Sequence, residues 1–135
     1  MSESLIYLEI VTPGRIVYNG EVKSFTAPGE DGSFQILPKH APFITTIIPG
    51  SVKFVLSTGE TNKFVTSGGT VEVHDNKITM LAESIIPVSE IVLADAEKER
   101  SEAERILESK EPGLDKDAAK QNLLTARAKI KAFSD

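Results

Sequence analysis

The amino-acid composition of the chain changes abruptly near Ser89, and this break limits the possible fold more than any other feature of the sequence. Residues 1–88 hold eight of the nine glycines, six of the seven prolines and seven of the eight Phe and Tyr residues. Only 15 of those 88 residues are charged, against 20 of the 47 that follow. Such a shift indicates two organisations within one chain. We therefore expect one domain over residues 1–88 and a second over residues 89–135.

The first part has the period-two pattern of β-strands. Apolar side chains alternate with others over residues 5–11, 51–56 and 71–74. Turn signals separate these segments, because Thr58-Gly59-Glu60 follows the second and Asp75-Asn76 follows the third. Short strands with turns every 8–12 residues or so are typical of an antiparallel β-sandwich or barrel.

Residues 89–135 show a helical period instead. The first helix is predicted to run from Ser89, as its N-cap, to about Lys110, and Asp115 is placed to cap a second helix. The apolar stripes expected to be buried are Val92, Ala96, Ala103 and Ile106 or Leu107 on the first helix, and Ala119, Leu123, Ala126, Ile130 and Phe133 on the second. Small residues let helices approach closely, but two short helices bury too little to be stable alone. The predicted fold is therefore mainly β with an α appendage: an N-terminal antiparallel β-sandwich followed by a C-terminal antiparallel two-helix hairpin that leans on the sandwich or on another protein.

Charge is divided unevenly between the two predicted helices. Residues 89–111 carry eight acidic and four basic side chains, whereas residues 120–135 carry four basic side chains and one acidic side chain. The basic side chains of the second helix include Arg127, Lys129 and Lys131. They either form a solvated surface with ion pairs inside the hairpin or dock on an acidic protein surface. The charge pattern alone leaves both interpretations open.

Composition and spacing argue against several functional classes. The chain has no Cys, which excludes disulfides, thiolate metal sites and cysteine nucleophiles. Its two histidines, His40 and His74, stand in no metal-ligand spacing, and neither a phosphate-binding loop nor a nucleophile elbow is present. The net charge of −5 disfavours nucleic acid as a partner. We expect no catalytic residue, no metal and no cofactor.

A specific resemblance begins in residues 27–42, which read APGEDGSFQILPKHAP. The pattern Gly-x-Phe-x-Ile-Leu-Pro-x-His-Ala-Pro within this run resembles the ε subunit of bacterial and chloroplast F-type ATP synthases, which is equivalent to mitochondrial δ. Further matching segments, in the order of the family, are Val11-Thr12-Pro13, Thr45 through Pro49-Gly50, Ser67-Gly68-Gly69, Val71-Glu72-Val73 and Ile78 through Glu83. The resemblance extends over essentially the whole chain.

This resemblance implies a non-catalytic subunit of the central stalk, which couples rotation of the c-ring and γ to ATP synthesis driven by protons or sodium ions. The implied partners are γ and the c-ring, with transient contact to the α/β catalytic head. The implied location is peripheral, at the cytoplasmic face of the inner membrane and held there only through the complex. The loop that faces the c-ring would consist of Glu30, Asp31, Gly32 and Ser33. Contacts with γ would come from Thr12, His40 and Thr45.

The resemblance also implies a regulatory role for the hairpin. In the family the hairpin either folds against the sandwich or extends along γ towards the catalytic head, where it restrains ATP hydrolysis. The basic residues Arg127, Lys129 and Lys131 would then meet an acidic segment of the catalytic β subunit.

The chain departs from the family at the nucleotide-binding motif of the hairpin. Some members bind ATP there through the pattern Ile or Leu-Asp-x-x-Arg-Ala. Here Glu90 stands in place of the Asp and Leu93 in place of the Arg, and a hydrocarbon side chain cannot supply the contacts of a guanidinium. We therefore expect no nucleotide site.

Two other hypotheses compete with the stalk subunit. One is a free-standing β-sandwich that binds proteins and whose hairpin masks the ligand surface. The other is a small enzyme whose site is not visible as a motif.

Overall fold

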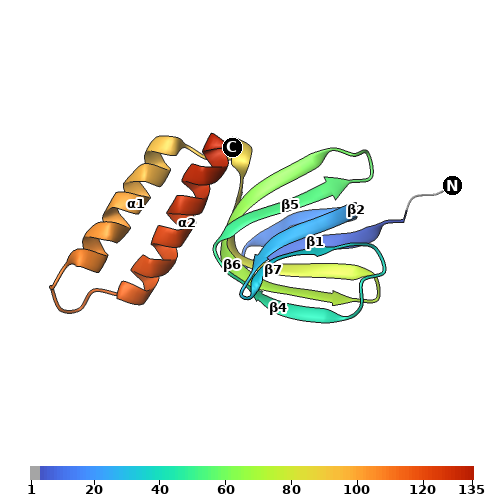
Figure 1. The fold of residues 1–135 in the computed structure, drawn as a ribbon, viewed down its shortest axis with the longest axis horizontal. Coiled ribbons are helices and arrows are strands. Elements are labelled where there is room, and N and C mark those ends of the chain that lie inside the picture. The colour runs from blue at the N-terminus through green and yellow to red at the C-terminus, as the bar shows by residue number, and fades with distance from the viewer. Residues whose placement is uncertain (1–3) are drawn as a thin grey trace.

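The computed structural model describes residues 4–135, which form a β-sandwich followed by a pair of helices (Figure 1). The strands are β1 (Ile6–Thr12), β2 (Arg15–Gly29), β3 (Gly32–Ile36), β4 (Phe43–Ile47), β5 (Gly50–Leu56), β6 (Thr61–His74) and β7 (Lys77–Pro87). The helical part consists of a 3-10 turn, η1 (Val88–Glu90), and the helices α1 (Leu93–Glu108) and α2 (Lys116–Ser134). The predicted fold class is confirmed. Residues 1–3 of the predicted first domain lie outside the described residues.

The long strands change partners along their length, which folds one continuous sheet into two layers. Residues 61–66 of β6 pair with β5, whereas residues 69–73 pair with β4. The change occurs at a bulge around Gly68 and Gly69, where both residues have positive φ angles. A side chain at Gly69 would collide with the carbonyl oxygen of Leu81, so the strand can bend here only with glycine.

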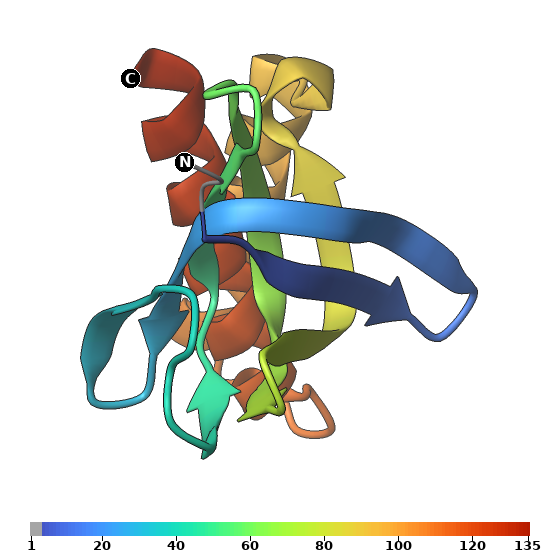
Figure 2. The same cartoon turned by 90° about the vertical axis from the view of Figure 1, so that its right-hand side faces the viewer.

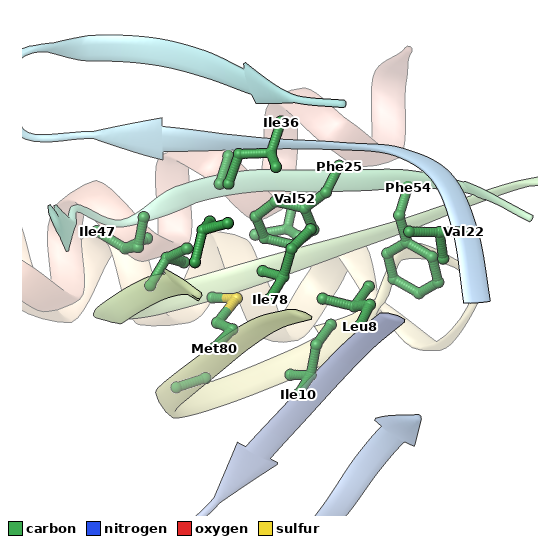
Figure 3. Close-up of a cluster of buried hydrophobic side chains, with 14 of the residues drawn as sticks. Leu8, Ile10, Val22, Phe25, Ile36, Ile47, Val52, Phe54, Ile78 and Met80 are labelled. Carbon is green, nitrogen blue, oxygen red and sulfur yellow. The ribbon is translucent and has the colours of Figure 1, made fainter. Parts of the chain in front are cut away.

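The alternation read from the sequence directs one side of each strand into the core. Leu8 and Ile10 of β1 are fully buried and meet Ile78 and Met80 of β7 in the cluster shown in Figure 3. Phe54 lies next to Tyr18 and Phe64, with ring centroids 4.6 and 5.6 Å away. Every residue of this cluster belongs to the strands, so the core is closed without the helices.

The helices lie on one side of the sandwich, behind the strands in Figure 2, with α2 between α1 and the strands (Figure 1). Asp115 caps α2 as predicted, because its Oδ1 accepts a hydrogen bond of 2.9 Å from the backbone N–H of Ala118. The cluster between hairpin and sandwich is small. Its members are Val65, Ile91 and Ala132, with Ile86, Val88 and Ala128 at its margin.

The predicted start of the first helix is wrong. Ser89 lies inside η1 and is no N-cap, and α1 begins only at Leu93. The cause is Ile91, which is 6% exposed and belongs to the cluster between hairpin and sandwich. The backbone at Ile91 and Val92 is extended, which places the Ile91 side chain in that cluster. The helix therefore begins after these two residues.

The predicted apolar stripes are correct at their alanines and wrong at both ends of the hairpin. Ala96, Ala103, Ala119 and Ala126 are buried. Val92 and Phe133, however, are 55% and 47% exposed. Ala132 is the residue of the last turn that reaches the sandwich, since it is 8% exposed and packs near Val65.

Neither helix in the described part of the chain is long and apolar enough to cross a bilayer.

Candidate functional site

The predicted c-ring loop is a tight turn between β2 and β3. Glu30 and Asp31 form the turn, and Gly29 pairs with Gly32 beneath them. A β-carbon on Gly29 would lie 2.8 Å from a ring carbon of Phe34, and Gly32 has a φ of +124°. Both flanking glycines are therefore needed for this turn.

Backbone hydrogen bonds hold this turn in place from its inner side. The N–H of Glu30 donates to the carbonyl of Thr46 at 3.1 Å, and the N–H of Ile48 donates to the carbonyl of Pro28 at 2.9 Å. These bonds attach the turn to the end of β4. Residues 30–33 are therefore held in a fixed position while they remain exposed to solvent.

His40 lies in the segment between β3 and β4 and is half-buried. Its Nδ1 is 2.7 Å from the carbonyl oxygen of Ala41, which accepts the Nδ1 proton. The ring meets Phe43 edge to face, with centroids 5.7 Å apart. These contacts fix the orientation of the His40 ring and leave Nε2 as the nitrogen that can meet a partner.

The side chain of Asn76 holds this segment to the rest of the sandwich. Its Oδ1 accepts a hydrogen bond of 2.8 Å from the N–H of Lys39, and its Nδ2 donates one of 2.9 Å to the carbonyl of Leu5. The carbonyl of Asn76 also accepts from the N–H of Tyr7 at 3.2 Å. The sequence marked Asn76 only as a turn residue, since contacts with residues so far away in the chain leave no local signal.

The three residues predicted to face γ lie around one part of the sheet without touching one another. Thr45 is half-buried in β4 opposite Val71, and Thr12 ends β1. Strands β6 and β7 separate β4 from β1, and His40 precedes β4. A partner that contacts both Thr12 and His40 covers the strands between them, whereas the side chain of Thr45 points to the opposite face of β4 from Ile44.

The outer face of these strands carries two large exposed apolar side chains, separated by the polar residues Thr70 and Glu72 of β6. Ile44 of β4 is 72% exposed and Leu81 of β7 is 54% exposed. Leu81 pairs with Val11 of β1 on one side and with Thr70 of β6 on the other. A hollow of about 450 Å³ opens beside Leu81 and is also lined by Val11. The exposed Leu81 and the hollow beside it are the apolar feature of this face on which a protein partner can pack.

Sequence reasoning missed these exposed apolar side chains on the outer face. The available signal was Ile44 and Leu81, two large apolar residues at positions where the alternation of their strands points to solvent.

The basic residues of α2 fall into two groups, one paired within the hairpin and one exposed. The Nζ of Lys129 lies 3.1 Å from Oε2 of Glu99 on α1, and the Lys129 side chain is only 21% exposed. Arg127 and Lys131 are exposed, share one face of α2 with Leu124, and form no ion pair within residues 4–135. The structure thus joins Lys129 to the hairpin and leaves the other two available to a partner.

The residues that replace the nucleotide motif lie at the start of the hairpin, Glu90 in η1 and Leu93 at the first position of α1. The groove between the helices and the strands has a volume of about 370 Å³ and is lined by Glu99, Glu102 and Lys129. Two hydrogen bonds from Arg105 lower the pKa of Glu102, so this carboxyl stays ionised. Each carboxylate is already paired with a cation, Glu102 with Arg105 and Glu99 with Lys129, so the lining of this groove offers no unpaired cation to a phosphate group.

Comparison with protein families gives one match over most of the chain. The family described as "ATP synthase, Delta/Epsilon chain, beta-sandwich domain" matches residues 5–88. The ATP synthase epsilon chain of Syntrophomonas wolfei is 37% identical over 132 residues, which cover 98% of this chain and 96% of the relative. The epsilon chain of Pelotomaculum thermopropionicum is 43% identical over 110 residues, which cover 82% and 81% of the two chains.

The solved structures that share the fold include two mitochondrial ATP synthases. One is the mitochondrial ATP synthase of Euglena gracilis, a complex with its c-ring, where a chain matches with a TM-score of 0.85 and 19% identity over 96% of this chain and 81% of that one. The other is the central stalk and c-ring of the Tetrahymena thermophila mitochondrial ATP synthase, with a TM-score of 0.66 and 22% identity over 98% and 99%. Such low identities show a likeness of fold.

Proposed function

The chain belongs to the delta/epsilon family of ATP synthase subunits and is not itself catalytic, and from this membership we propose that it works in the central stalk, gripping γ and resting on the c-ring. The observation that carries the proposal is the 37% identity to an ATP synthase epsilon chain over 98% of the residues, because it includes both the sandwich and the hairpin. In this role the subunit couples rotation of a proton- or sodium-driven ring to ATP synthesis. It is a peripheral protein of the cytoplasmic face of the inner membrane, held there by the complex.

The γ-binding surface is the outer face of β4, β6, β7 and β1. Ile44 and Leu81 supply its exposed apolar side chains, with polar residues of β6 between them. Thr12 lies at one side and His40 at its margin. Thr45 reaches γ from the other face of β4, because its side chain points away from that of Ile44. An interface of this kind gains its affinity from a buried apolar centre with polar groups at its rim.

The c-ring contact is the β2–β3 turn. Glu30 and Asp31 are exposed at its tip, and the hydrogen bonds to Thr46 and from Ile48 stop the turn from yielding under load. A close-packed sandwich behind the turn deforms little, so torque passes through it as through a rigid body.

The hairpin is the regulatory part. It rests on the sandwich through a small cluster, and it exposes Arg127 and Lys131 on its outer face. When the hairpin leaves the sandwich and extends along γ, these cations reach the acidic surface of the catalytic head and restrain ATP hydrolysis.

Single-cysteine crosslinking tests the two contact surfaces. Because the chain has no Cys, any cysteine introduced into it is the only thiol. In complexes isolated from membranes we expect Ile44→Cys to crosslink to γ and Asp31→Cys to the c-ring. Glu60→Cys, in the exposed β5–β6 turn, is the matched control and should crosslink to neither. Recovery of the tagged protein alone, without α, β and γ, would instead favour a free-standing binding module.

A further inference from the structure

Two lysines face each other directly on the outer side of the β5–β6 pair. Lys53 of β5 is the register partner of Lys63 of β6. Like charges placed opposite each other destabilise a sheet, and this arrangement occurs in a chain whose net charge is −5. Within residues 4–135 neither lysine forms an ion pair. Their charges therefore lack a counter-ion in the described chain.

Free hydroxyl groups surround these lysines. Thr26 is the register partner of Lys53 on β2, and Ser33 and Ser51 line the same hollow, whose volume is about 260 Å³. In the described chain none of the three hydroxyls takes part in a hydrogen bond. Two ammonium groups and three hydroxyls thus line one hollow as unused donors. The acidic residue at its margin is Asp135, and neither of its carboxylates lies within 4.0 Å of the ammonium group of either lysine.

We propose that this hollow binds a phosphoryl group. A phosphate monoester carries a charge of about −1.5 to −2 at neutral pH and offers three acceptor oxygens, which suits two lysines and a set of hydroxyls. A carboxylate carries only one charge and would leave one lysine without compensation. Lysine is a point-charge phosphate ligand and needs no bidentate geometry. The same chemistry fits free phosphate and the headgroup of a phosphomonoester lipid.

The position of the hollow connects its occupancy to the hairpin. Val88, where the chain leaves the sandwich, and Ala132, where α2 returns to it, both line the hollow. The two lysines and three hydroxyls all belong to the strands, whereas the docked hairpin adds the apolar Ala132 and the acidic Asp135. A bound phosphoryl group therefore disfavours the docked hairpin. Asp135 opposes the ligand by charge repulsion. This inference goes beyond the stalk function, because it concerns a ligand of the isolated chain.

The test is a titration of the isolated full-length protein with inorganic phosphate, with chloride at equal ionic strength as the reference. Amide NMR shifts of Lys53, Lys63 and Ser51 should saturate with phosphate alone. The variant Lys53→Thr/Lys63→Thr should lose affinity about tenfold or more, since hydrogen bonds to charged groups are the strong ones. Its melting temperature should not fall, because threonine suits a strand and the repulsion is gone.

The matched control is Lys98→Thr/Lys110→Thr, which removes the same charge from exposed positions of the hairpin and should keep the wild-type affinity. Asp135→Asn should bind phosphate more tightly. Linear, non-saturating shifts, or equal losses in both double variants, would overturn the proposal for free phosphate.

Vesicles distinguish the two sources of the group. The protein should float with phosphatidic acid vesicles but not with phosphatidylcholine vesicles if the ligand is a lipid headgroup, and this flotation should depend on Lys53 and Lys63. Absence of both saturable phosphate binding and lysine-dependent flotation would overturn the proposal entirely. No ATP synthase partner enters either measurement, so this proposal can fail while the stalk function stands.

Discussion

The sandwich and the hairpin are stabilised by different kinds of side chain. The core of the sandwich buries large residues such as Phe25 and Phe54, which are fully inaccessible to solvent. The buried positions of the two helices are all alanines, for example Ala103 and Ala126. Burial stabilises in proportion to apolar area, so an alanine contributes far less than a phenylalanine. One chain therefore combines a rigid sandwich with a hairpin whose docking is stabilised by little buried apolar area.

The polar contacts within the sandwich are likewise stronger than those between the hairpin and the sandwich. Thr66 is fully buried in the sandwich, and its hydroxyl bonds to the carbonyls of Ser84 and Gly68 and to the N–H of Gly68. The polar link from the hairpin to the strands is a bond of 3.5 Å from Gln121 Nε2 to the carbonyl of Ser67, at the limit of a hydrogen bond. The hairpin can therefore detach at low cost without disturbing the sandwich.

The largest effect is expected from removing a core ring. Phe54→Ala should lower the free energy of unfolding by about 3–5 kcal/mol, because it leaves a cavity beside Tyr18 and Phe64. The matched control is Phe133→Ala on α2, where the ring is exposed and the change should stay within about 0.5 kcal/mol. Urea unfolding measures both variants. Similar losses would mean that the two regions are equally well packed.

A smaller effect should follow from removing the hairpin altogether. A chain that ends at Val88 should still unfold cooperatively, since the main core lies within the strands. Its free energy of unfolding should fall by about 2 kcal/mol, as expected for exposing Val65, which is 1% exposed in the whole protein. Calorimetry measures the transition, and binding to γ checks that the outer face is intact. A molten or aggregated fragment would contradict the independence of the sandwich.

A third change weakens the sandwich at its γ-facing margin alone. Asn76→Gly keeps the positive φ of 58° but removes the hydrogen bonds to Lys39 and Leu5. Stability should fall by about 1–2 kcal/mol, at about 1 kcal/mol per bond, and affinity for γ should fall because the His40 segment is released. The matched control is Asp75→Gly, where φ is 50°, and it should leave γ binding unchanged. Equal γ affinity in both variants would show that Asn76 is only a turn residue.

The strands could be predicted from the sequence because alternation and turn residues act locally. Ile6, Leu8 and Ile10 face the core as expected, and Asp75-Asn76 forms the expected turn with positive φ at both residues. Long-range contacts were beyond such reasoning. The outer face with the exposed Ile44 and Leu81 forms only when β1, β7, β6 and β4 are placed side by side. The bonds of Asn76 join segments far apart in the chain.

The two helix starts show the same limit within the hairpin. Asp115 was correctly predicted as a cap because its bond to Ala118 is local. Ser89 is not a cap, although its residue type is favourable. Ile91 packs in the cluster with Val65 and Ala132, and its burial there determines the local backbone. A tertiary contact worth the burial of one isoleucine exceeds the roughly 1 kcal/mol of a cap.

The smallest change concerns the outer face of α2 and tests whether the weakly held hairpin has a use. Arg127 and Lys131 are exposed and form no ion pair within residues 4–135, so their replacement costs the docked state little. Exposed ion pairs contribute about 0.2–1 kcal/mol each. Losing two of them should lower the population of the extended hairpin several-fold. Arg127→Ala/Lys131→Ala should therefore raise ATP hydrolysis by the assembled complex and leave assembly intact. Added salt should act in the same direction, since screening weakens exposed pairs.

Lys129→Ala is the informative control, because it breaks the 3.1 Å contact with Glu99 that closes the hairpin. It should loosen the folded hairpin, and hydrolysis should not rise. If wild type, the double variant and the chain ending at Val88 hydrolyse ATP at the same rate, the hairpin has no inhibitory part, and its weak attachment needs another explanation.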